Sequence, residues 1–524
     1  MQRESVLARL QGGVEEFDFI VIGGGASGLG AAVDAASRGY HVALIEQADF
    51  AKGTSSRSTK LAHGGVRYLK QGDIALVRSA LRERGLMQRN APHLVHTLAF
   101  VIPNYSWWDR SFYAMGMAVY ERLAGKLSLG RSQQLNRAET VEHLPTVEPK
   151  GLAGGVLYYD GQFDDARFAI NLAQTAAEHG AAVINYCACV GLIKEQGRVA
   201  GVRARDVESG VEFELRARAV INATGVFVDE IRRFDEPAAA PLVAVSQGVH
   251  LVLPRRFLPG SSALMVPKTA DGRVLFAIPW HDRLVVGTTD TPGVTAALEP
   301  QAQEAEIQFI LEHARHYLAV DPEERDVLSV FTGLRPLVSR GVGGSTAALS
   351  RDHAIAVSTS RLLTITGGKW TTYRKMAEDV VDHAERVAGL SHRVCGTYNL
   401  AIHGAVNPDL VHAALRVYGT DAEKIAQLVR DDPTLGLPLH PAFSYLQAEV
   451  VWHARHEMAR TVEDVLARRA RALVLDARAS IAAAPIVARL LARELQRDEI
   501  WVQSQIRAYT ELARGWLLRP DAVA

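Results

Sequence analysis

Three glycines near the N-terminus have the spacing of a phosphate-binding turn. The apolar run 17–22, FDFIVI, has the length and residue types of a buried strand. Gly23, Gly25 and Gly28 follow it in the pattern G-x-G-x-x-G. In such a unit the first glycine permits a tight turn, the second lets backbone amides approach a pyrophosphate, and the third lets the next helix pack closely. These residues therefore predict a dinucleotide site at the N-terminus of a helix.

An acidic residue stands where the same unit would contact a ribose. A second predicted strand, 41–45, ends in Glu46, 18 residues after Gly28. A carboxylate there can accept hydrogen bonds from both hydroxyls of an adenosine ribose. Glycines alone are a weak signal, but strand, glycines, helix, strand and acid in one unit are specific. The alternative is a structural βαβ turn without a ligand, and this unit does not separate FAD from NAD.

Two later segments favour FAD. A predicted strand at 219–221 leads into Ala-Thr-Gly at 223–225, which resembles the second FAD-contacting strand of flavoproteins with two dinucleotide-binding domains. Another apolar strand, 362–365, leads into 366–369, TGGK, and a helix expected from about residue 371. The positive end of that helix could stabilise an anionic reduced flavin. Three separated pieces would then build one discontinuous flavin domain.

Four longer motifs resemble the FAD-dependent glycerol-3-phosphate dehydrogenases. They are TSSRSTKLAHGGVRYL at 54–69, GLRPL at 333–337, TGGKWTTYR at 366–374 and HARHEMARTVEDVLARRARALVLD at 453–476. The resemblance covers nearly the whole chain and implies FAD as cofactor. The cofactor-binding residues expected are Gly23, Gly25, Gly28, Glu46, Thr54, Ser55, Ser56, Val190, Ala223, Thr224, Gly225, Gly368, Lys369 and Thr371.

The resemblance implies oxidation of sn-glycerol 3-phosphate to dihydroxyacetone phosphate, with a hydride passing from substrate C2 to flavin N5. A phosphate dianion needs fixed cations. The resemblance places Arg67 and Arg335 on the substrate side of the flavin, where a guanidinium suits phosphate oxygens. Lys369 adds a third cation, and the hydroxyl of Tyr68 a further donor.

The C2 hydroxyl also needs a proton acceptor. His63 is the first candidate, because an imidazole with its ordinary pKa of ~6.5 can take a proton at neutral pH. Its alternative role is to hold a loop or to bond the flavin, and Arg335 could instead polarise the C2 oxygen. His250, in an apolar strand, ranks third, and we expect Asp290 to cap a turn.

The amino-acid composition excludes some classes of binding partner and of site. Lys plus Arg and Asp plus Glu both number 58, so the formal net charge of +0 offers no general field for nucleic acid. The chain has 524 residues and three cysteines, which predicts several domains, no disulfide framework and a reducing, cytoplasmic compartment. Cys187 and Cys189 share a strand face, but no histidine or further cysteine nearby completes a metal site, so we expect no metal.

The expected fold class is α/β, a two-dinucleotide-binding-domain flavoprotein with a Rossmann-like FAD domain. Short strands and turn residues over 243–287 predict an antiparallel-sheet substrate domain, and periodic Ala, Arg and Leu after 400 predict a helical C-terminal domain. We expect the FAD domain at 1–75, 156–240 and 346–390, the substrate domain at 76–155 and 241–345, and the helical domain at 400–524.

The sequence motifs do not identify the acceptor of the electrons. The resemblance implies a membrane quinone. No secretory signal or membrane-spanning run is evident, but 105–120, YSWWDRSFYAMGMAVY, combines aromatic and basic residues in a way that suits a membrane interface. A buried aromatic cluster is the alternative. Basic helices such as 460–471 could serve the membrane, a partner or a homodimer contact. We expect a cytoplasmic protein bound peripherally to the cytoplasmic membrane.

Three other functions compete with this hypothesis. An oxidase of the same substrate would pass the electrons to oxygen. An amino-acid or sarcosine-type oxidase on the same fold would bind a carboxylate with an arginine. A protein with this fold could also bind no flavin and act as a carrier of lipidated proteins.

Overall fold

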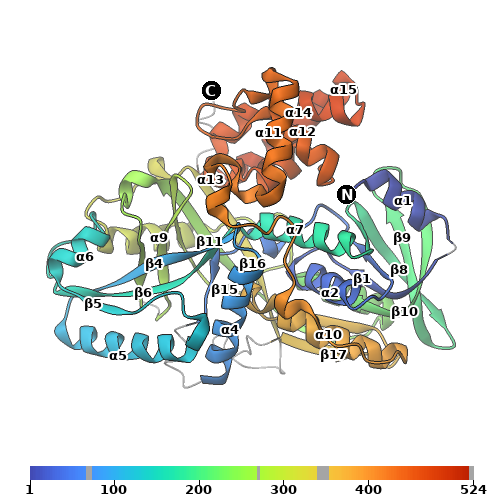
Figure 1. Ribbon diagram of the computed structural model, residues 1–524, viewed down its shortest axis with the longest axis horizontal. Coiled ribbons are helices and arrows are strands. Elements are labelled where there is room, and N and C mark those ends of the chain that lie inside the picture. Colours follow the sequence, from blue (N-terminus) through green and yellow to red (C-terminus); the bar gives the residue numbers. More distant parts are fainter. Residues whose placement is uncertain (14, 66–73, 268, 270–271, 339–352, 519–524) are drawn as a thin grey trace.

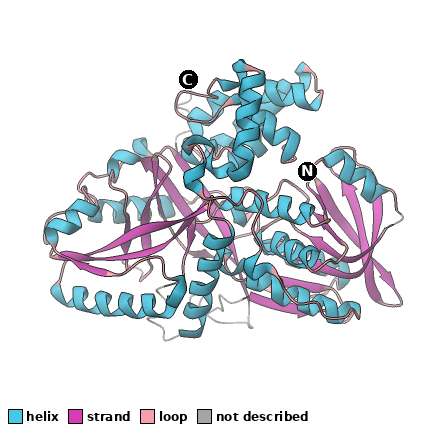
Figure 2. Cartoon of the chain, in the orientation of Figure 1, coloured by secondary structure: helices cyan, strands magenta, loops and turns pink. Residues whose placement is uncertain are grey.

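The chain folds into two sheets joined by a helical domain. The computed structural model describes residues 1–13, 15–65, 74–267, 269, 272–338 and 353–518. Figure 1 shows the C-terminal helices, orange to red, lying across the junction of the two sheets, which Figure 2 draws in magenta. The predicted fold class is thereby confirmed. The boundaries of the six predicted segments remain a prediction.

The first sheet carries the glycine turn. Its order is β17-β18-β10-β1-β2-β7, and β9 joins β10 to β8. β1 lies between β10 and β2 and is parallel to both, so the carboxyl ends of these strands share one edge of the sheet, where such folds bind ligands. The strands are β1 Glu16–Ile22, β2 Val42–Ile45, β7 Ala182–Ile184, β8 Cys187–Glu195, β9 Arg198–Asp206, β10 Glu212–Asn222, β17 His353–Val357 and β18 Leu363–Gly367.

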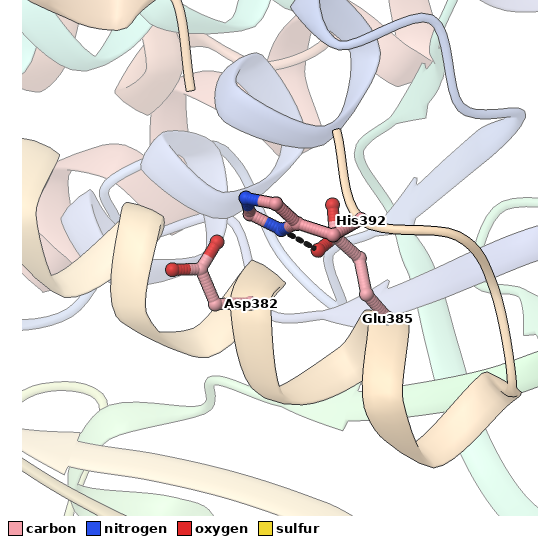
Figure 3. A group of neighbouring side chains, drawn as sticks. All are labelled: Asp382, Glu385 and His392. Carbon is pink, nitrogen blue, oxygen red and sulfur yellow. Dashed lines mark hydrogen bonds and ion pairs between the residues drawn. The ribbon is translucent and has the colours of Figure 1, made fainter. Parts of the chain in front are cut away.

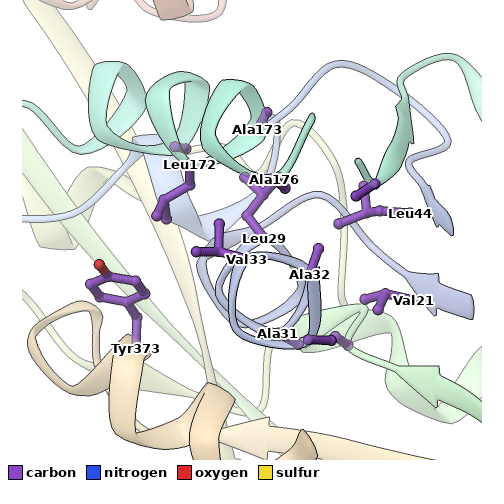
Figure 4. Close-up of a cluster of buried hydrophobic side chains, with 14 of the residues drawn as sticks. Val21, Leu29, Ala31, Ala32, Val33, Leu44, Leu172, Ala173, Ala176 and Tyr373 are labelled. Atoms are coloured by element: carbon purple, nitrogen blue, oxygen red, sulfur yellow. The ribbon is translucent and has the colours of Figure 1, made fainter. Parts of the chain in front are cut away.

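Small residues on α2 (Ala26–Ser37) explain how three helices pack together over this sheet. Ala31, Ala32 and Ala35 are fully buried, so neighbouring elements approach α2 closely. Figure 4 shows α2 between Leu172 of α7 (Asp165–Glu178), Tyr373 of α10 (Tyr373–Ala388) and the sheet. The second half of β1, 19–22, is apolar and buried because this part of the strand lies under these helices.

The second sheet is mostly antiparallel, as the punctuated strands at 243–287 predict. Its order is β15-β11-β14-β13-β12-β4-β6-β3, with β16 on β11 and β5 on β6, and only the β12–β4 pair in the described residues is parallel. Its strands are β3 Leu61–Ala62, β4 Val95–Asn104, β5 Gln133–Leu135, β6 Gly154–Phe163, β11 Val243–Pro254, β12 Ala263–Val266, β13 Leu275–Trp280, β14 Arg283–Gly287, β15 Thr291–Pro292 and β16 Ser329–Val338. Around it lie α4 Ile74–Asn90, α5 Trp107–Ala124, α6 Arg137–His143 and α9 Glu304–Tyr317.

The C-terminal domain is helical, as predicted, but its basic segment 460–471 is not a surface helix. A π-helical turn spans Asp464–Arg469, and Arg468, Arg469 and Arg471 are all buried. Helical periodicity cannot reveal that distant carboxylates neutralise these arginines. The helices are α11 Ala422–Asp431, α12 Gln447–His456, α13 Ala472–Leu475, α14 Ala477–Leu495 and α15 Glu499–Arg514, and a separate α1 spans Arg3–Gln11. In the part of the chain that is described, no helix is both long and apolar enough to cross a bilayer.

One acidic cluster resembles a metal site in composition. Asp382, Glu385 and His392 lie together on and beside α10 (Figure 3). Arg38 Nη1, at the end of α2, lies 2.6 Å from Asp382 Oδ1 and 3.1 Å from Glu385 Oε1, so a guanidinium already neutralises the carboxylates. His392 Nδ1 lies 2.7 Å from the other oxygen of Glu385. The cluster is an ion-pair network that ties α2 to α10.

A histidine between two carboxylates makes stability depend on pH. His403 donates to Glu178 Oε1 at 2.5 Å and Asp421 Oδ2 at 2.6 Å, which joins α7 to the helical domain. Burial opposes the imidazolium, but the hydrogen bonds to Asp421 and Glu178 outweigh it and raise the pKa of His403 to about 9. This contribution is complete below the unfolded pKa of ~6.5 and is lost as pH rises through about 9.

The variant His403→Gln should therefore have a lower Tm than the parent protein at about pH 6, and the difference should shrink above about pH 9. Thermal unfolding followed by circular dichroism at both pH values measures it. An equal difference at the two pH values would show that the charge of His403 contributes nothing.

Candidate active site

The glycine turn leaves the N-terminus of α2 open. Gly23 has φ +113°, a conformation that favours glycine, and Gly25 is the N-cap of α2. A Cβ on Gly28 would lie 1.9 Å from the carbonyl oxygen of Gly23, so only glycine lets helix and turn approach this closely. The first amides of α2 are thus exposed to a cavity, in the arrangement that can hold a pyrophosphate.

Glu46 is fixed at the end of β2. Its Oε2 accepts from the amide of Gly24 at 2.6 Å, and its Oε1 accepts from the amide of Ala48 at 2.8 Å. Burial raises the pKa of this carboxyl, and the two amides oppose that rise. Because each carboxylate oxygen has a second lone pair, Glu46 can still accept from ribose hydroxyls.

A loop after β2 contacts two of the flavin segments and the substrate sheet. We call residues 54–60 the flavin loop. Ser55 Oγ accepts from the amide of Ala26 at 2.9 Å, and Trp370 Nε1 donates to the carbonyl of Ser55 at 2.9 Å. Thr54 Oγ1 donates to the carbonyl of Leu334 at 2.6 Å. The loop therefore contacts α2, the TGGKW motif and the GLRPL strand at once.

Most of the predicted site residues line one continuous cavity. It runs from the glycine turn to the face of the second sheet. The predicted residues that line it are Gly23, Gly25, Glu46, Thr54, Ser55, His63, Ala223, Thr224, Gly225, Arg335, Gly368, Lys369 and Thr371.

Three predicted residues do not line the cavity. Gly28 packs beneath the turn, and Ser56 is a buried residue of the flavin loop. Val190 does not line the cavity, whereas Cys187 and Cys189 on the same strand do. Arg67 and Tyr68 lie outside the described residues, so their expected contact with the substrate phosphate stays a prediction.

Arg335 is held on β16 by a set of acceptors. Its Nη1 lies 3.1 Å from the carbonyl oxygen of Thr289 and 3.3 Å from Asp290 Oδ1. A Cβ on Gly248 would lie 2.3 Å from Arg335 Nη2, so the guanidinium lies against β11 and a side chain at position 248 would displace it. Asp290, which the sequence suggests only as a turn cap, is thus an ion-pair partner of Arg335.

His250 lies beside Arg335 at the cavity wall. Its ring stacks on Phe331 with centroids 4.7 Å apart, and its Nε2 lies 2.9 Å from Thr59 Oγ1. Among the described residues its Nδ1 has no hydrogen-bond partner. Burial, with the positive charges of Lys60 and Arg335, holds the pKa of His250 well below its ordinary value. The ring is therefore neutral at neutral pH, with one nitrogen that carries no proton.

Sequence reasoning gave too little weight to the face of β11. Gly248 and His250 are two residues apart and line the same cavity, as the alternation of a strand requires. The two-residue spacing of Gly248 and His250 is a sequence signal that could have identified this face of the cavity. Arg57 and Arg273 also line the cavity, but nothing in the sequence distinguishes them from other arginines.

Comparisons with known proteins show which family the chain resembles. A family model described as FAD dependent oxidoreductase covers residues 18–374, and one described as C-terminal domain of alpha-glycerophosphate oxidase covers 358–500. Mitochondrial glycerol-3-phosphate dehydrogenase of Mesocricetus auratus is 40% identical over 97% of this chain and 74% of its own length. The human enzyme is 40% identical over 98% and 75%.

Solved structures agree with the fold. Glycerol-3-phosphate dehydrogenase of Bacillus halodurans, complexed with FAD, has a TM-score of 0.81 and 27% identity, and the match covers 99% of this chain and 98% of that one. L-alpha-glycerophosphate oxidase of Mycoplasma pneumoniae, with FAD bound, has a TM-score of 0.58 and 16% identity over 74% and 98%, which shows the fold alone. Together with the family model, these matches confirm the prediction of FAD.

The variant Gly28→Ala tests the glycine turn. Its Cβ must push Gly23 away, so we expect FAD affinity to fall by about tenfold or more. Gly116→Ala, on α5 with open space around the new Cβ, is the matched control and should bind FAD normally. Titration of the FAD-depleted protein, followed by flavin fluorescence, measures both. Unchanged affinity in Gly28→Ala would place FAD elsewhere.

Proposed function

The chain belongs to the FAD-dependent glycerol-3-phosphate dehydrogenase family, and from this premise we propose that it oxidises sn-glycerol 3-phosphate and passes the electrons to a membrane quinone. The observation that supports this most directly is the convergence of Arg335, Lys369, His63 and His250 on the cavity that begins at the glycine turn. Cationic side chains and candidate proton acceptors therefore line the cavity in which the flavin ring would lie.

The site must first bind the phosphate group of the substrate. Asp290 and the carbonyl of Thr289 orient the Arg335 guanidinium, whose planar fork suits a phosphate oxygen or the C2 oxygen. Lys369 lines the cavity from the other sheet. More than one cation suits a phosphate dianion better than the single carboxylate of an amino-acid substrate. Arg67 and Tyr68 remain proposed as further phosphate ligands.

Oxidation of the C2 alcohol to a ketone removes a hydride and a proton. FAD, when bound, supplies the hydride acceptor at N5. The proton must pass from the C2 hydroxyl to a group of the protein as the hydride leaves. His63 lies after the flavin loop, and its backbone amide donates to Thr371 Oγ1 at 3.2 Å. His250 faces the same cavity from β11.

We favour His250 as the proton acceptor and keep His63 as the competing candidate. His250 is 2% exposed, and its Nδ1 has no partner in the described part of the chain. Arg335 lies beside it and would orient the C2 oxygen. With its lowered pKa, His250 is deprotonated above that value, so activity should be present at neutral pH and lost as pH falls.

Substitution of the two histidines separates these candidates. His250→Gln should lower kcat by about a hundredfold or more and remove the acidic limb of its pH profile, because the proton acceptor is lost. His63→Gln, the matched substitution, should keep that limb. Steady-state kinetics from about pH 5 to 9 measures both profiles. Loss of the limb in His63→Gln alone would assign the role to His63.

Helix α5 supports the proposal of a membrane contact. Met117 and Tyr120 pack into the core, at 1% and 3% exposure, whereas Met115 and Val119 are 67% and 43% exposed. One face of this aromatic segment is therefore core, and the other is apolar surface, which supports the proposal of a membrane contact. In Figure 1 α5 runs along the face of the substrate sheet opposite the C-terminal domain. Such a face suits the interfacial region of a bilayer.

The oxidase is a second candidate because the C-terminal match is to a domain of alpha-glycerophosphate oxidase. Turnover of glycerol 3-phosphate with a quinone analogue or with oxygen, each with and without lipid vesicles, distinguishes the two. We expect faster turnover with the quinone analogue and a further increase with vesicles. Stoichiometric peroxide, with no gain from the quinone analogue, would establish the oxidase.

A further inference from the structure

The helical C-terminal domain reaches the flavin loop from the side opposite the cavity. Arg471, which is 1% exposed, donates through Nη2 to the carbonyl of Ser56 at 2.9 Å and to Asp165 Oδ1 at 2.8 Å. We propose that Arg471 is a positioning residue for FAD: it fixes the flavin loop through Ser56 and Asp165, so that the C-terminal domain sets the affinity for the cofactor.

Asp165 connects Arg471 to the rest of the loop. Its Oδ2 accepts from the amide of Ser58 at 3.0 Å, from Ser58 Oγ at 2.7 Å and from Lys60 Nζ at 2.7 Å. Lys60 Nζ also donates to the carbonyl of Ser56 at 2.8 Å. Ser56, Ser58 and Lys60 are therefore fixed by Arg471, Asp165 or each other. Ser55, Arg57, Ser58 and Thr59 line the cavity, whereas Ser56 and Lys60 do not.

The network is balanced in charge and shielded from water. Lys60 and Asp165 are 0% exposed, and Arg471 Nε lies 3.4 Å from Asp164 Oδ1, so two cations face two carboxylates. Burial, together with repulsion from Arg471, lowers the pKa of Lys60 to about 8, and Asp165 limits that fall. Loss of one buried charge leaves its partner uncompensated, which costs more than loss of a surface pair.

A second contact holds the chain just before the flavin loop. Asp49, between Glu46 and the loop, accepts from Arg468 Nε at 2.5 Å and from Arg469 Nη1 at 2.6 Å. The segment 468–471 therefore contacts the chain after β2 at two places. One is Asp49, just after Glu46, and the other is the flavin loop. These contacts give the buried basic segment of the C-terminal domain a role at the cofactor site.

The same contacts reach the proposed proton acceptor. Thr59 lies between Ser58 and Lys60, and its Oγ1 is 2.9 Å from His250 Nε2. A flavin loop that loses its support would move this hydroxyl as well. Arg471 thus acts on both FAD affinity and the orientation of His250 without touching either the cofactor site or the cavity.

The experiment compares Arg471→Met with Arg167→Met in the full-length protein. Arg167 is an equally buried arginine between the FAD domain and the helical domain, but its carboxylate partner is Glu457, at 2.7 and 2.8 Å, and not the flavin loop. We expect both variants to lower Tm, and Arg471→Met alone to weaken FAD binding by about tenfold or more. Titration of the FAD-depleted chains, well below both Tm values, measures the affinities.

Arg471→Lys keeps the charge but can make fewer of the bonds, so its FAD affinity should lie between those of the parent and Arg471→Met. This variant also carries the test if Arg471→Met does not fold. Parental FAD affinity in both Arg471 variants, or an equal loss in Arg167→Met, would overturn the proposal.

The inference rests on the proposed position of FAD in the cavity, and the two fail differently. If Gly28→Ala impairs FAD binding while Arg471→Met does not, only the role of Arg471 is rejected. If neither variant affects binding, the position of FAD itself is wrong.

Discussion

The structure depends on a backbone contact at the end of β1 that leaves no room for a side chain. The carbonyl of Gly23 and the α-carbon of Gly28 are so close that α2 can start directly at the sheet edge. This places the first amides of α2 beside the flavin loop, whose Ser55 hydroxyl bonds one of them. The TGGKW and GLRPL segments then close on the same loop through Trp370 and Thr54.

Buried charge is the second constraint. The formal net charge of +0 is an average over a chain whose interior holds many paired arginines. Arg468, Arg469 and Arg471 bring three cations from the C-terminal domain to Asp49 and Asp165 in the FAD domain. Pairs of this kind cost desolvation energy and add little net stability, but removal of one partner is severe. They therefore define how the domains fit together rather than simply strengthening the fold.

Much of the fold and of the cofactor site follows from local sequence. The strand, glycines and Glu46 predict one sheet edge because their spacing within one short unit is diagnostic, and Arg335 and Lys369 follow from motifs. The sequence could not show that Lys60, Asp165 and Arg471 meet, because they come from segments more than a hundred residues apart. It also misplaced 460–471 on the surface, because arginine-rich periodicity is the same whether the partner is solvent or a buried carboxylate.

We propose that this cavity oxidises glycerol 3-phosphate with FAD. Anaerobic mixing of the purified, FAD-loaded protein with glycerol 3-phosphate, glycine or sarcosine tests it most directly, with the visible flavin absorbance as the signal. The account predicts bleaching by glycerol 3-phosphate alone. Bleaching by glycine or sarcosine without glycerol 3-phosphate, or a protein that takes up no FAD, would contradict it.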